Sequence, residues 1–86
     1  MEKELLDKVE GLGGLFFSPE EITVILGIES ALQHKEEFKR AHNKGLLQKE
    51  AMVRKSIFDL AEQGSSPAQL LAIKIIEDSI LRRIPV

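Results

Sequence analysis

The stretch Phe17-Ser18-Pro19-Glu20-Glu21-Ile22, closed by Leu26-Gly27-Ile28, predicts a short helix with a defined start and a sharp stop. Ser18 suits the N-cap, because its hydroxyl can accept a hydrogen bond from the amide of Glu21. The Glu21 side chain can in turn accept from the amide of Ser18, which completes a capping box. Pro19 fits the first helical position, where no amide donor is needed.

The end of this helix is equally well marked. Gly27 can adopt the left-handed conformation that ends a helix, and Ile28 can then fold back onto Ile22. Phe17 and Ile22 stand at the two positions of a hydrophobic staple. The core-facing residues are predicted to be Ile22, Ile25 and Leu26.

A second helix should open at Ser30, run to about Asn43 and stop at Gly45. Two short helices joined by a tight glycine turn are typical of a helix-turn-helix. The standard pattern is not fully met, since Thr23 stands where a small residue usually packs and Gln33 where an apolar residue usually sits. The turn is therefore expected to be longer or differently angled than the standard one, or the motif is absent.

Three further helices complete an all-α bundle of about five short helices. The first covers residues 2–10 and is broken by Gly11-Leu12-Gly13-Gly14, which we interpret as a flexible connector. The fourth covers about 47–63. The fifth covers about 67–83, with Ser66 as N-cap and Gln69 completing a capping box. The whole chain, 1–86, is predicted to be one domain, in which 15–49 is the helix-turn-helix-like part and 50–86 a helical hairpin.

Composition narrows the class of protein. The chain has 86 residues, no cysteine and 43% hydrophobic residues, which suits one small domain with a modest core. Neither a signal peptide nor an apolar run long enough to span a bilayer is recognisable. A cytoplasmic protein is therefore expected.

The charges are segregated along the chain. Residues 1–34 carry two lysines against seven acidic residues, a net charge of −5. Residues 35–55 carry seven cations against three glutamates, +4, and residues 56–86 carry −1. A basic zone inside a net acidic protein can attract phosphate, although a solvated helix of mixed charge is the competing interpretation.

If the second helix reads DNA, residues near its start contact base edges and the cations around it contact phosphates. The predicted base-contacting residues are Ser30, Gln33, His34 and Glu37. The predicted phosphate-contacting residues are Lys35, Lys39, Arg40, Lys44 and Lys49. Glu36 and Glu37 count against this interpretation, because carboxylates repel phosphate.

The fifth helix is apolar on more than one side, which favours an interface with a second copy of the chain. A central position in the bundle is the alternative. The predicted interface residues are Leu70, Leu71, Ile75, Ile76, Ile80 and Leu81, and Ile84 continues the same arc.

No catalytic residues, metal ligands or cofactor are predicted. His34 and His42 are eight residues apart rather than the four typical of paired metal ligands on a helix, and no third ligand is evident. The glutamate pairs 20/21 and 36/37 are adjacent in sequence and so diverge on a helix. The serines are explained as caps, without a neighbouring base.

Several segments together resemble one family. They are Leu15–Ile22, Leu26-Gly27-Ile28, Phe38–Ala41, Lys44-Gly45 and Val53–Ala68. The most distinctive part is Arg54–Ala68. This order is similar to the small terminase subunit of tailed bacteriophages and prophages.

The resemblance implies a non-enzymatic subunit that binds double-stranded viral DNA through a helix-turn-helix, assembles into a homo-oligomeric ring, and presents the DNA to a large ATPase/nuclease subunit in the cytoplasm of a bacterial host. The alternatives are a small helix-turn-helix transcriptional regulator that binds a palindrome as a dimer, and a helical protein–protein interaction module without DNA binding.

Overall fold

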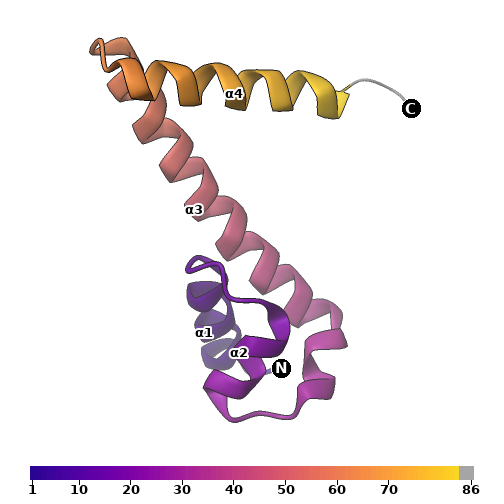
Figure 1. Cartoon of the computed structure of the whole chain (residues 1–86). Coiled ribbons are helices and arrows are strands. Elements are labelled where there is room, and N and C mark those ends of the chain that lie inside the picture. Colours follow the sequence, from indigo (N-terminus) through magenta and orange to yellow (C-terminus); the bar gives the residue numbers. More distant parts are fainter. Residues whose placement is uncertain (84–86) are drawn as a thin grey trace. The chain divides into compact units, whose positions relative to one another are not determined.

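The computed structural model describes residues 1–83, and all of its regular structure is helical (Figure 1). The α-helices are α1 (Lys3–Gly13), α2 (Pro19–Leu26), α3 (Glu36–Glu62) and α4 (Ser66–Arg83), and a 3₁₀-helix, η1 (Ser30–His34), lies between α2 and α3. The all-α class is confirmed. The expected five short α-helices are replaced by four, one of which is long.

The chain divides into two compact units, unit 1 (Met1–Glu50) and unit 2 (Ala51–Val86). The helix α3 contributes its first part to unit 1 and its last part to unit 2.

Both predicted ends of α2 are confirmed. The Ser18 amide donates to the Glu21 carboxylate over 2.9 Å, and the Glu21 amide donates to the Ser18 hydroxyl over 3.2 Å. Gly27 has a φ of 65°, and the amide of Ile28 donates to the carbonyl of Thr23 over 3.0 Å. This is the hydrogen-bond pattern of a Schellman motif, so local sequence alone sets the length of α2.

The core of unit 1 is small and comes from three helices. Val9 of α1, Ile22 of α2 and Phe38 of α3 are completely buried, and Phe17 and Ile28 are among the residues packed against them. The buried hydroxyl of Thr23 donates to the carbonyl of Glu20 over 2.6 Å, so this polar group is satisfied within α2.

The glycines at 11–14 do not form a flexible connector, and that prediction was wrong. The helix α1 continues to Gly13, and both Gly13 and Gly14 are buried. A Cβ atom on Gly13 would come within 2.5 Å of the carbonyl oxygen of His42 in α3. At Gly13 the absence of a side chain lets the backbones of two helices meet, and no free bending of the chain is involved.

Gly45 does not end a helix, because α3 passes through it without interruption. A Cβ atom on Gly45 would overlap the carbonyl oxygen of Glu10 in α1. Glycine in a helix interior costs about 1 kcal/mol relative to alanine. At this position the absence of a side chain is what allows α1 and α3 to approach so closely.

The predicted helix over residues 30–43 is also corrected. Residues 30–34 form η1, and α3 begins only at Glu36. Between α2 and α3 the chain therefore has a glycine turn followed by a 3₁₀-helix, rather than the tight turn of a standard helix-turn-helix.

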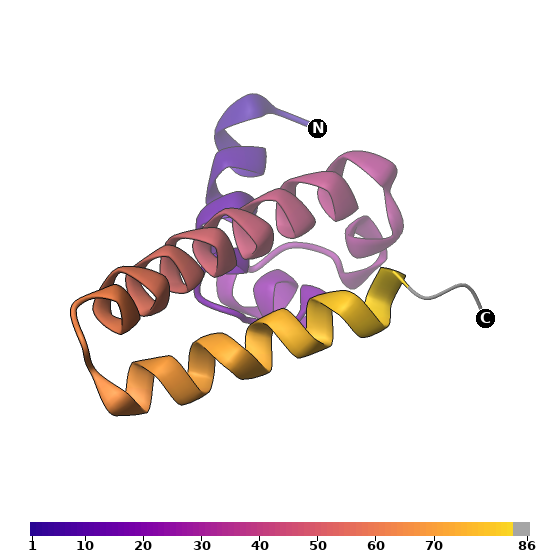
Figure 2. The ribbon, with the colours of Figure 1, turned by 90° about the horizontal axis from the view of Figure 1, so that it is seen from above.

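Unit 2 contains the end of α3, a turn, and α4 (Figure 2). Gly64 has a φ of 95°, and the amide of Ser65 donates to the carbonyl of Leu60 over 3.1 Å. The N-cap of α4 is Ser65, whose hydroxyl accepts from the amide of Ala68 over 3.4 Å, and not Ser66 as predicted. The Gln69 amide group donates instead to the Ala61 carbonyl, so no capping box forms.

Candidate nucleic-acid interface

The four residues predicted to contact bases do not lie on one helix. Ser30, Gln33 and His34 belong to η1, whereas Glu37 is in the first turn of α3. Ser30 and His34 are exposed and Gln33 is half-buried.

Glu37 already has a cationic partner. The α-ammonium group of Met1 lies 2.6 Å from its carboxylate. This hydrogen bond, with the positive charge of the ammonium group, lowers the pKa of the Glu37 carboxyl. One of the two carboxylates expected to repel phosphate is thus neutralised as an ion pair, and it is also less free to accept from a base.

Three exposed cations of unit 1 lie at the start of α3. Lys35, Lys39 and Arg40 are exposed, and none of them forms an ion pair with another residue of the described range 1–83. The carbonyl of Lys35 accepts from the amide of Lys39 over 3.1 Å, so Lys35 directly precedes the first turn of the helix. The three cations therefore lie within about one and a half turns.

The buried Phe38 marks the inner face of α3, and at 100° per residue the other cations can be placed around it. Arg40 lies about 200° from Phe38 and Lys44 about 240°, on the outer face. Lys44 forms an ion pair of 3.1 Å with Glu10. Lys49 lies only about 20° from Phe38, and it is half-buried. Of the five predicted phosphate contacts, Lys49 is the least available.

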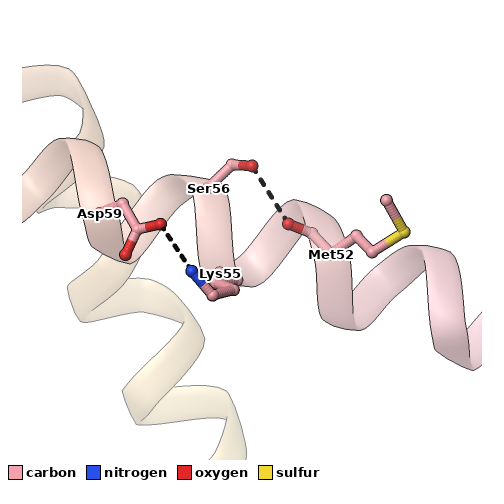
Figure 3. Close-up of polar contacts among 4 residues, drawn as sticks. All are labelled: Met52, Lys55, Ser56 and Asp59. Carbon is pink, nitrogen blue, oxygen red and sulfur yellow. Dashed lines mark hydrogen bonds and ion pairs between the residues drawn. The ribbon is translucent and has the colours of Figure 1, made fainter.

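One cation farther along α3, Lys55, has its partner within the same helix. Lys55 forms an ion pair of 3.0 Å with Asp59, and the Ser56 hydroxyl donates to the carbonyl of Met52 (Figure 3). The basic zone seen in the sequence is thus partly neutralised in unit 2, and its freely accessible cations are those of residues 35–40.

The apolar residues of α4 are mostly exposed. Only Ala68 and Ala72 are buried, while Ile75 and Ser79 are half-buried. The predicted interface residues Leu70, Leu71, Ile76, Ile80 and Leu81 are each about half exposed or more. Ile84 lies outside the described residues.

One surface was missed by sequence reasoning. Ile25 was expected to face the core, but it is 50% exposed, and Val24 is 76% exposed. Together with Phe17, Glu20 and Glu21 they line a shallow hollow on α2. Helical spacing could have predicted the exposure of Val24, because Val24 lies about 200° around the helix from the buried Ile22.

The two histidines lie in different elements, not two turns apart on one helix. His34 is exposed on η1, and His42 is in α3 with its Nε2 atom 2.9 Å from the carbonyl oxygen of Phe17. Across residues 1–83 no three His, Asp or Glu side chains are grouped so as to hold a metal ion. None of the helices in that range combines the length and the apolar character needed to cross a membrane.

Comparisons with known proteins gave no relative: no protein-family model matches the sequence, and neither the curated proteins nor the solved structures contain a matching chain.

Proposed function

We propose that the chain is a non-enzymatic DNA-binding subunit of the kind its sequence resembles, the small terminase subunit. It would hold the phosphate backbone of double-stranded DNA with Lys35, Lys39 and Arg40. The observation that carries the proposal is the exposure of these three cations, close together and without an ion pair among residues 1–83, in a protein of net charge −2.

The geometry narrows the set of contacts. Lys44 lies on the same outer face as Arg40, but its ion pair with Glu10 would have to break before Lys44 could bind a phosphate. The pairing of Glu37 with Met1 leaves Glu36 as the one carboxylate between Lys35 and Arg40 that forms no ion pair with another described residue. Phosphate contacts by residues 35–40 are therefore better supported than base contacts by Ser30, Gln33, His34 and Glu37.

The proposed partners follow from the same resemblance. A homo-oligomer formed through α4 is supported by its exposed leucines and isoleucines, because helices with a large unburied apolar surface commonly lie in interfaces. A large ATPase/nuclease subunit would receive the DNA, in the cytoplasm of a bacterial host.

The second candidate is a protein–protein interaction module without DNA binding. It is favoured by the many exposed apolar side chains on α2 and α4. A small transcriptional regulator is the third candidate, and it would be a dimer rather than a ring. Molecular mass from light scattering separates a dimer from a ring.

Fluorescence anisotropy of a short labelled DNA duplex, titrated with the full chain at several salt concentrations, tests DNA binding. If three phosphates are neutralised, the logarithm of the binding constant should fall with the logarithm of the salt concentration at a slope of roughly −2.7. Lys39→Glu combined with Arg40→Glu should abolish binding.

The matched control is Lys3→Glu combined with Lys8→Glu, which makes the same change in net charge on exposed positions of α1. This control should retain most of the affinity, and far-ultraviolet circular dichroism should show both variants folded. The proposal would be refuted if the chain did not bind the duplex at low salt, or if the control variant lost as much affinity as the Lys39→Glu, Arg40→Glu variant.

A further inference from the structure

The surface of α2 is unusually apolar for a solvent-facing helix. Val24 and Ile25 are exposed side by side in sequence, and Phe17 adds an aromatic side chain to the same hollow. The preceding turn carries two further exposed apolar side chains, Leu15 and Phe16. Exposed apolar side chains gathered around a hollow are typical of a protein–protein contact.

This surface is also held in place. The capping box fixes the start of α2, and the Schellman motif fixes its end. The carbonyl of Phe17 is within hydrogen-bond distance of His42, which anchors the entry to the helix on α3. A surface that is already ordered loses little conformational entropy when a partner binds.

Acidic side chains border the hollow. Glu20 and Glu21 line it together with the apolar residues, and both are exposed. Hydrogen bonds from the amide and the hydroxyl of Ser18 lower the pKa of the Glu21 carboxyl and so favour its charged form. Two copies of this hollow would repel each other, and the surface instead complements a partner that is apolar and basic.

We propose that the hollow on α2 docks an amphipathic helix of another protein, whose apolar face covers Val24 and Ile25 and whose lysines or arginines lie against Glu20 and Glu21. A helix is the fitting occupant because a short row of apolar side chains on one helix packs against the apolar face of another. The proposal is independent of DNA binding, because none of these residues belongs to the proposed phosphate contacts.

The probe is a labelled synthetic helix of leucine and lysine, with all leucines on one face, and its binding to the full chain is measured by fluorescence anisotropy. A matched peptide of leucine and glutamate should bind at least about tenfold more weakly. Val24→Ser combined with Ile25→Ser should weaken binding of the lysine peptide about tenfold, because the apolar area it covers is lost.

Matched variants distinguish the hollow from a general charge effect. Leu47→Ser removes an exposed apolar side chain from α3 and should leave binding unchanged. Glu20→Lys should weaken binding severalfold, whereas Glu4→Lys makes the same charge change on α1 and should not.

Two outcomes would overturn the docking site. Equal losses for Glu20→Lys and Glu4→Lys would show non-specific attraction to an acidic protein. A fall in molecular mass of the Val24→Ser, Ile25→Ser variant in light scattering would show that the hollow is an interface between copies of this chain. The Lys39→Glu, Arg40→Glu variant should bind the lysine peptide normally even if DNA binding itself is refuted.

Discussion

Phe16 holds a backbone conformation that a bulky residue rarely adopts. Its φ is 67°, its amide donates to the Gly13 carbonyl, and the Phe17 amide donates to the Leu12 carbonyl. Phe16 thus occupies the left-handed position that follows a helix, where glycine is preferred. An exposed phenylalanine there costs about 1–2 kcal/mol in backbone energy.

Phe16→Gly should therefore raise the free energy of unfolding by about 1 kcal/mol. Gly27→Ala, at the equivalent position after α2, should lower it by a similar amount. The chain has no tryptophan or tyrosine, so urea denaturation followed by far-ultraviolet circular dichroism is the suitable measurement. A destabilised Phe16→Gly protein would contradict the assignment of strain to this residue.

Two carboxyl groups make the stability of unit 1 depend on pH. The pKa of Glu21 is lowered by its hydrogen bonds with Ser18, and that of Glu37 by the ammonium group of Met1. A lowered folded-state pKa stabilises the fold above the unfolded value, near 4.5, and this contribution is lost as the pH falls through the folded value.

Glu37→Gln should accordingly flatten the loss of stability as the pH falls below 4.5, measured by urea denaturation at a series of pH values. The control is Glu4→Gln, at an exposed carboxylate without a side-chain hydrogen bond or ion pair in the described part of the chain. An identical pH profile for Glu37→Gln and the unmodified protein would show that the pair with Met1 does not form in solution.

At the scale of elements, the contact between α1 and α3 depends on glycine. Gly45→Ala should lower the free energy of unfolding by at least about 2 kcal/mol, because its Cβ would overlap the backbone of Glu10. Gly11→Ala is the matched control, since nothing lies near a Cβ at that position within α1. It should stabilise the protein by about 0.5–1 kcal/mol. The free energy of unfolding of both variants is measured by urea denaturation. Equal changes for Gly45→Ala and Gly11→Ala would contradict the close contact between α1 and α3.

The elements differ in how far sequence could predict them. Both ends of α2 were predicted correctly because capping boxes and glycine stops involve neighbours in sequence. Gly13 and Gly45 were misread because a glycine that breaks a helix and one that lets two helices touch look the same locally. Only the approach of α1 to α3 distinguishes them. The choice of Ser65 over Ser66 as the cap of α4 was a shift of one residue in the same local pattern.

The candidate site depends on contacts that the sequence does not signal. The basic zone could be predicted from the order of charged residues in the sequence. Three contacts that limit its accessible cations could not. Met1 pairs with Glu37 across 36 positions, Glu10 pairs with Lys44, and Lys49 falls on the inner face of α3. These contacts depend on the tertiary fold of unit 1, and within its part of the basic zone they leave Lys35, Lys39 and Arg40 as the exposed cations without an ion pair to another described residue.

For the whole molecule, the exposed apolar surface of α4 predicts self-association. Ile76→Lys combined with Ile80→Lys should reduce the mass measured by light scattering towards the 9.6 kDa of a single chain. Leu47→Lys, on an exposed apolar residue of α3 in unit 1, should leave the mass unchanged. A single-chain mass for the unmodified protein would argue instead that α4 binds a different protein.

The direct backbone contact between α1 and α3 also limits which substitutions this sequence can accept during evolution. Exchange of an exposed residue on either helix leaves this backbone contact intact. Exchange of Gly45 or Gly13 does not, because every other residue adds an atom where a carbonyl already lies. Distant homologues should therefore be recognisable by glycines spaced like Gly13 and Gly45, even where the charges of α3 and the apolar residues of α4 have changed completely.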